Sequence, residues 1–371
     1  MLQTFFIYTI TFLLILSFSW RIKTICTKCY LQLHSVNVYV GLMLLVFTFV
    51  FGLRYNVGID YENYLYALKH HEYEELEFIF RWVSKFFTIF ELPTWLYFSL
   101  WAFIQFFFFL FAFKDEKKIY PYLVIVLFLG QYFMLWMNVI RQDTATCIVM
   151  CMISYLIIKD YKKYILLACV ALGFHTSSLM MTLCLLAFIW KKDYLKIPII
   201  VQLALLLVSF YVFASNINVL GDIDLLLNVY LSDTTYDKYS YGAILNTTEE
   251  NVIGGTLYVN TLIDVLCIAY SEKMKKFYNN DKFTICYNLY FIGAILGLLF
   301  GFSFILLRPV RYFRFFKLVI VAYLLNYLHC QKSTRTTLIF WLCIAALFAL
   351  YVAMFSYSSD SCYEYHFCFS R

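Results

Sequence analysis

Long apolar segments recur from one end of the chain to the other, and they constrain the fold more than any other feature. A helix rises about 1.5 Å per residue, so roughly 20 apolar residues cross the ~30 Å hydrocarbon core of a bilayer. Such segments lie at 4–20, 36–53, 94–113, 119–137, 139–158, 197–214, 253–270, 283–307, 312–328 and 336–357. The sequence therefore predicts an all-α, polytopic integral membrane helical bundle with about ten spans.

The composition leaves no room for a soluble domain. Of 371 residues, 63% are apolar and 14% are charged, whereas a soluble domain carries about 25% charged residues. The longest polar stretch is near 215–252. We therefore expect residues 1–371 to form a single transmembrane domain, with extracytoplasmic loops at 54–93 and 215–252. The net charge of +6 lies in short loops rather than on one basic surface, so we expect no nucleic-acid partner.

Two segments depart from the simple span. Segment 164–190 has a polar centre, and we interpret it as a re-entrant hairpin of two half-helices rather than one tilted span. Segment 78–90 is too short to cross a bilayer, and its polar residues fall on one helical stripe, which is typical of a helix lying in the membrane interface. The polar residues of that stripe are Arg81, Ser84, Lys85 and Thr88.

The distribution of basic residues predicts the orientation. The loops 21–35, 114–118, 159–163, 191–196, 271–282 and 329–335 hold 18 of the 29 Lys and Arg residues. The positive-inside rule places these six loops in the cytoplasm and both termini outside. Five arginines then lie on the outer side, at helix ends, where topology disfavours them: Arg54, Arg141, Arg308, Arg311 and Arg314.

The first polar island follows the second apolar segment, at 54–64. Gly58 permits a turn, and Asp60 can orient an arginine or accept a proton. An ordinary polar loop with aromatic anchors is the alternative interpretation.

The second polar island, 138–143, opens an apolar segment. Arg141 falls in the first helical turn, where free N–H groups also attract anions, and its planar guanidinium suits phosphate oxygens. The alternative is an arginine that reaches the interface and pairs with Asp143.

The third polar island, 174–178, interrupts segment 164–190. An ionisable group at that depth normally faces a cavity or a partner, and His175 can act as a general base or acid near neutral pH. The alternative is a hydrogen-bonded core histidine whose neighbouring serines help helices pack.

Other polar and sulfur-containing residues favour structural interpretations or leave the choice open. The basic run that begins at Arg308 can bind a pyrophosphate or lipid headgroups. For Asp264 and Asn260, inside one span, we favour a structural hydrogen-bonded pair. Cys26 and Cys29 form one C-x-x-C without a second pair at zinc spacing, so we expect no metal and no cofactor.

Five motifs together resemble the EpsG family, which comprises Wzy-like membrane proteins of bacterial exopolysaccharide, capsule and O-antigen synthesis. They are R-Y-x-V-G-x-D-Y-x-x-Y at 54–64, E-x-x-F at 75–78, I-R-Q at 140–142, F-H-x-S-S-L at 174–179 and R-x-x-x-Y-F at 308–313. The resemblance covers about 35–330. The usual E-P-G-F/Y of the family reads Glu75-Leu76-Glu77-Phe78 here, and the tail 358–371 lies outside the pattern.

The resemblance implies a multi-pass enzyme of the bacterial inner membrane, a glycosyltransferase that polymerises polyprenyl-pyrophosphate-linked oligosaccharide repeat units on the extracytoplasmic face. Membrane lipid and other polysaccharide-assembly proteins would be its partners. For this reaction we expect His175 and Asp60 to be the catalytic residues; either one can be the base, and we favour His175. The resemblance predicts substrate binding by Arg54, Tyr61, Arg141, Gln142, Ser177, Arg308 and Arg311.

Two rival functions use similar residues. A transporter or flippase of lipid-linked oligosaccharide also needs arginines in a cavity, but internal repeats and polar residues through the full membrane depth are typical of transporters. Here the polar islands cluster on one side, which favours an enzyme. A glycan ligase or acyltransferase that uses His175 as its base differs only in the acceptor.

Overall fold

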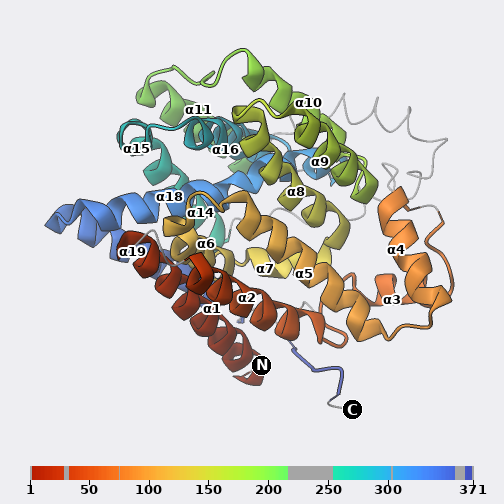
Figure 1. Ribbon diagram of the computed structural model, residues 1–371. Coiled ribbons are helices and arrows are strands. Elements are labelled where there is room, and N and C mark those ends of the chain that lie inside the picture. Colours follow the sequence, from red (N-terminus) through yellow and green to blue (C-terminus); the bar gives the residue numbers. More distant parts are fainter. Residues whose placement is uncertain are drawn as a thin grey trace. The chain divides into compact units, whose positions relative to one another are not determined.

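The computed structural model describes residues 2–28, 33–74, 76–215, 254–301, 304–355 and 364–369, and its helices are labelled in Figure 1. Within these ranges every regular element is a helix, and the extended pairing is limited to one isolated bridge between Arg54 and Phe367. The chain divides into two compact units, Met1–Trp190 with Leu325–Arg371, and Lys191–Leu324. Each unit is described by itself.

The first unit is a helix bundle in which α1 packs on α2, α2 on α5, α5 on α8, and α8 on α9 (Figure 1). Gly52 permits the approach of α2 to α5, because a Cβ there would lie 2.4 Å from the Cα of Ser99. The helices of this unit are α1 Leu2–Lys28, α2 Leu33–Gly52, α3 Tyr61–Lys69, α4 Phe78–Ile89, α5 Thr94–Ala112, α6 Tyr120–Leu129, α7 Tyr132–Asn138, α8 Ile140–Ile157, α9 Tyr161–Phe174, α10 Ser178–Leu186 and α19 Thr334–Met354.

The second unit contains α11 Ile199–Ala214, α14 Gly255–Ala269, α15 Ser271–Tyr278, α16 Asp281–Leu299, α17 Phe304–Arg314 and most of α18 Phe316–Gln331, whose last residues belong to the first unit. Helix α16 packs on α17 at Gly293, where a Cβ would lie 2.5 Å from the carbonyl carbon of Phe313. The predicted extracytoplasmic loop 215–252 lies, except for Ser215, outside the described residues.

The membrane-helical class is confirmed, whereas the count of about ten spans is not. Seven described helices are long and apolar enough to cross a bilayer. An eighth is obtained if the pair Lys117–Leu129 and Tyr132–Asn138, bent by 66°, is one span. The bend follows from Gly130 and from Gln131, whose φ of 65° is left-handed. Helices α11 and α14 are apolar but have only 16 and 15 residues.

Some predicted boundaries were wrong. The predicted span 283–307 ends early, because α16 stops at Leu299 and α17 begins at Phe304. In α4 the predicted polar stripe does not face outward as a whole, since the Ser84 hydroxyl is buried and lies 2.9 Å from the Tyr97 hydroxyl of α5. Phe78, Trp82 and Phe86 are exposed on α4, together with Lys85 and Ile89. Segment 164–190 is two helices, as expected, and its return to the side it left stays a prediction.

Candidate functional site

The first two polar islands meet at Gly58. The backbone there has a φ of 109°, which an L side chain rarely adopts. A Cβ at Gly58 would lie 2.8 Å from Asn138 Oδ1, and the same oxygen accepts a 2.7 Å hydrogen bond from the Ile59 backbone N–H. Asn138 ends α7, two residues before α8 begins at Ile140. The turn therefore fixes the 54–64 motif against the start of the I-R-Q motif.

Arg141, in the first turn of α8, forms an ion pair with Glu77, which directly precedes α4. Their Nη1 and Oε2 atoms are 2.5 Å apart, and the side chains are 28% and 10% exposed. The guanidinium also lies over the ring of Phe80, 5.8 Å from its centroid. One donor of Arg141, Nε, is buried without a hydrogen-bond partner among the described residues. The ion pair therefore fixes the position of Arg141, while one of its hydrogen-bond donors is not used by the residues that the structure describes.

The same carboxylate reaches the third polar island. Glu77 Oε1 accepts a long 3.4 Å hydrogen bond from the Thr176 backbone N–H. Beside it, His175 ends α9 in an extended conformation, and its Nδ1 lies 2.6 Å from Ser177 Oγ. Helix α9 approaches α4 closely, because a Cβ on Gly173 would lie 2.4 Å from a side-chain atom of Ile79. Residues about 100 positions apart in the chain are therefore neighbours in space.

Glu77 is the site residue that the sequence analysis missed. The E-x-x-F motif directed attention to Glu75, which lies outside the described residues. Only the position of Glu77 next to the first residue of α4, Phe78, distinguished it in the sequence, and that signal is weak. In the structure, Glu77 contacts two of the three polar islands.

Tyr64, on α3, lies beside Arg141 of α8. Burial raises the pKa of the Tyr64 hydroxyl, while the positive charge and hydrogen bonding of Arg141 oppose that rise and the carboxylate of Asp60 adds to it. Asp60 occupies the N-cap position of α3, is half-buried, and its backbone oxygen accepts a hydrogen bond from the Tyr64 N–H. The structure thus places Asp60 and Arg141 around one tyrosine.

Arg54 has a different environment from Arg141. It is 3% exposed and donates hydrogen bonds to the backbone oxygens of Phe51, at 2.9 Å, and Met137, at 3.0 Å. Its backbone pairs with the tail at Phe367, and the neighbouring Tyr55 N–H donates to His366 O. These contacts join α2, α7 and the C-terminal segment. These contacts support a structural role for Arg54. Substrate binding by Arg54 stays a prediction.

Two further predicted binding residues are buried. Tyr61 is 1% exposed and stacks on Phe98, with ring centroids 4.4 Å apart. Burial raises the pKa of Tyr61 to about 12, an effect that the nearby Arg54 opposes. Gln142 is 2% exposed. Of the predicted residues in this unit, His175, Ser177, Arg141 and Asp60 are the more accessible ones.

Arg308 and Arg311 lie on α17 of the second unit and are half-buried. In the same unit, Asp264 pairs with Lys317 at 2.8 Å and accepts a hydrogen bond from the Tyr290 hydroxyl. The expected hydrogen-bonding partner of Asp264, Asn260, instead offers its backbone oxygen to Lys317. The sequence analysis did not identify Lys317 as the ion-pair partner.

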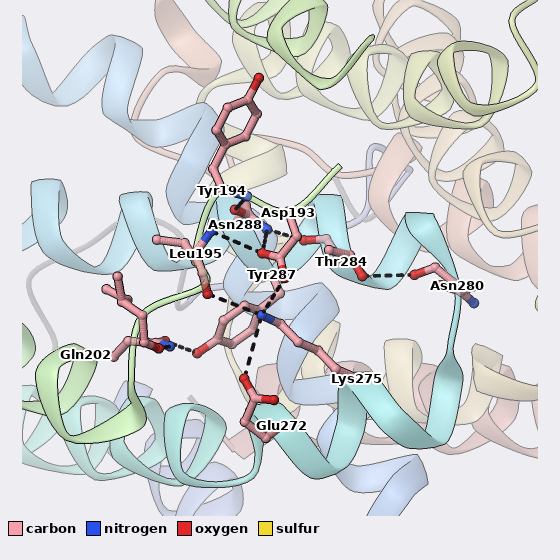
Figure 2. A network of polar contacts seen from close by, with 11 residues as sticks. Asp193, Tyr194, Leu195, Gln202, Glu272, Lys275, Asn280, Thr284, Tyr287 and Asn288 are labelled. Carbon is pink, nitrogen blue, oxygen red and sulfur yellow. Dashed lines mark hydrogen bonds and ion pairs between the residues drawn. The ribbon is translucent and has the colours of Figure 1, made fainter. Parts of the chain in front are cut away.

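A second polar network in the same unit was also missed (Figure 2). Asp193 accepts hydrogen bonds from Lys275 Nζ, at 3.1 Å, and from Asn288 Nδ2, at 3.3 Å. Burial would raise the pKa of Asp193, but these bonds outweigh it and lower the pKa. The network joins the predicted cytoplasmic loops 191–196 and 271–282, and charge counting alone does not reveal such pairing.

Within the ranges that the structure describes, three or more His, Cys, Asp or Glu side chains nowhere gather so that they could hold a metal ion. Cys26 is a free, half-buried thiol, and Cys29 lies outside the described residues.

Comparison with known proteins identifies the family. The EpsG family model matches residues 37–367. The match extends further than the expected 35–330 and reaches the C-terminal segment that pairs with Arg54. No curated protein and no solved structure matches the chain. With nearly its whole length matched, the chain belongs to the EpsG family.

Proposed function

We propose that this protein is a Wzy-like glycosyltransferase that polymerises polyprenyl-pyrophosphate-linked oligosaccharide repeat units on the extracytoplasmic face of the bacterial inner membrane. Membership of the EpsG family and the apolar helices support a role in polysaccharide synthesis at a membrane. One observation carries the more specific proposal. Glu77 joins Arg141 of the second polar island to the backbone of the third, while Asn138 fixes the first island beside them.

The reaction needs few chemical groups. The acceptor hydroxyl oxygen attacks the anomeric carbon of the donor glycan and forms the new glycosidic bond. The bond from that carbon to the diphosphate oxygen breaks, and the diphosphate leaves with the electron pair. A base takes the hydroxyl proton. Since the diphosphate is a good leaving group, its charge needs stabilisation more than protonation.

Arg141 is suited to stabilise the leaving diphosphate. Its planar fork makes charge-assisted bonds to phosphate oxygens, and Nε has no hydrogen-bond partner within the described part of the chain. Glu77 acts as a positioning residue that holds the guanidinium at Nη1. That Arg308 of α17 also binds the diphosphate stays a prediction.

His175 is the favoured base, and its ability to accept a proton at Nε2 depends on which partner donates in its hydrogen bond with Ser177. When the Nδ1–H group donates to Ser177 Oγ, the lone pair lies on Nε2 and that nitrogen can accept a proton; when the serine hydroxyl donates to Nδ1, it cannot. A general base contributes about 10²–10⁴-fold in rate. In purified protein, His175→Ala should lower kcat by that factor while donor binding persists. Near-normal turnover would assign the base to Asp60, which Asp60→Asn then tests.

The arginine assignment is tested by conservative substitution. Arg141→Lys keeps the charge but loses the bidentate fork, so we expect weaker donor binding and slower polymerisation. Arg335→Lys is the matched control, since Arg335 is exposed at the start of α19, far along the chain from the polar islands. Equal rates for both variants would refute the role of Arg141.

A flippase is the rival function, and the surface glycan of a deletion strain separates the two. A polymerase defect leaves single repeat units at the surface. A flippase defect removes surface glycan and leaves the lipid-linked unit on the cytoplasmic side. A ligase or acyltransferase defect leaves polymer that is not transferred or not modified.

A further inference from the structure

An apolar groove runs along helix α4, next to the candidate site. It has a volume of about 290 Å³ and is lined by α4 and by Leu100 of α5. The lining includes Phe78, Trp82 and Phe86, which are 61%, 57% and 52% exposed. In a chain with seven helices able to cross a membrane, such a face is suited to an apolar chain rather than to water.

The lining of the groove adjoins residues of the candidate site. Phe78, at its edge, follows Glu77, the ion-pair partner of Arg141. Ile79, another lining residue, packs against Gly173, two residues before His175. The ring of Phe80 lies under the Arg141 guanidinium. An amphiphile whose anionic group contacts Arg141 would therefore have an apolar surface within reach of its first carbons.

The donor of the proposed reaction has this form, because its diphosphate is bonded directly to an isoprenoid chain. We propose that the α4 groove binds the isoprene units nearest the diphosphate and so aligns the donor at Arg141; this inference rests on the proposed function. The hydrophobic effect does not select the isoprenoid, since bilayer lipid is equally apolar. Selection comes from van der Waals packing of the methyl branches against the aromatic rings, and from attachment to the bound diphosphate.

Photo-crosslinking tests the groove without needing turnover. The probe is an isoprenyl diphosphate with a diazirine on its second isoprene unit, incubated with the full-length protein in phospholipid nanodiscs. We expect the label on the 78–87 peptide, with competition by unlabelled isoprenyl diphosphate. Labelling elsewhere, or labelling that added phospholipid with matched charge removes equally, would show an ordinary lipid surface and overturn the proposal.

A kinetic test separates the groove from the proposed function. Val83→Trp fills the groove, and Leu45→Trp is the control, since Leu45 is 62% exposed on α2. We expect Val83→Trp to raise KM roughly tenfold for the isoprenoid-linked donor and to leave unchanged the KM for a donor whose diphosphate carries only a methyl group. Equal changes for both donors would refute the groove. If the wild-type protein binds the probe in the groove but polymerises neither donor, the polymerase assignment fails and the binding site stands.

Discussion

The ion pair between Glu77 and Arg141 supports the arrangement of the polar islands, so its removal is the most informative perturbation. The pair joins the residue before α4 to the first turn of α8, and Glu77 also accepts from the Thr176 backbone. Glu77→Gln keeps the shape and removes the charge. Arg141→Gln instead leaves the carboxylate of Glu77 without its cation.

The free energy that this ion pair contributes to stability can be estimated from the burial of its two side chains. Exposed ion pairs contribute about 0–1 kcal/mol, whereas breaking a fully buried pair costs about 3–5 kcal/mol. With side chains 10% and 28% exposed, this pair lies between those limits, at about 1–3 kcal/mol. Arg141→Gln should cost more than Glu77→Gln, because the carboxylate it leaves unpaired is the more buried charge, whereas Arg141 keeps its neighbour Tyr64.

A double-mutant cycle measures the coupling directly. The free energy of unfolding of the wild type, both single variants and the double variant is followed in mixed detergent micelles by SDS titration. We expect the two single losses to exceed the loss of the double variant by about 1–3 kcal/mol. A coupling energy below about 0.5 kcal/mol, the level of an exposed pair, would refute the argument that this contact holds the islands together.

Three further predictions concern other parts of the chain. Gly58→Ala should destabilise the protein by about 1–3 kcal/mol, because its φ is 109° and the new Cβ meets Asn138, whereas Gly41→Ala, with nothing within 4 Å, should be harmless in the same melting assay. Because the pKa of Asp193 is lowered in the folded protein, its charge stabilises the fold above the ordinary value of about 3.9, and this stabilisation is lost as the pH falls through the lowered pKa. The melting-temperature advantage over Asp193→Asn should therefore begin to shrink near about pH 4 and vanish at more acidic pH; an advantage that does not shrink on acidification contradicts this. In a cysteine-depleted background, an impermeant thiol reagent should label Tyr66→Cys in intact cells and Lys118→Cys only after permeabilisation, and the reverse would overturn the topology.

The sequence predicted the fold class because long apolar segments leave a chain few alternatives. It predicted the break near His175 from the charge count, because the positive-inside rule holds for the neighbouring loops only if segment 164–190 returns to the side it left. The number of membrane spans was harder to predict from the sequence. Helices α11 and α14 end after 16 and 15 residues, and the bend at Gln131 depends on a left-handed backbone that composition does not reveal.

The candidate site was predicted in its parts but not in its connections. Arg141 and His175 stood out because ionisable groups are rare in apolar segments. Glu77 did not, because a carboxylate in a polar loop is ordinary until the fold brings it to Arg141. Arg54 was conspicuous for its charge, yet its partners are backbone oxygens, one of them 83 residues away, which local pattern cannot indicate. The pairing of Asp193 with Lys275 was hidden in the same way.

The central claim is tested most directly by reconstitution with defined substrates. The purified protein is mixed with one synthetic polyprenyl-pyrophosphate-linked repeat unit, and the products are separated by glycan length while released polyprenyl diphosphate is measured. The account predicts a ladder of multiples of the repeat unit, one diphosphate released for each new glycosidic bond, and a much weaker ladder with Arg141→Lys. Intact single units that only change their side of the membrane, with no diphosphate released, would contradict it.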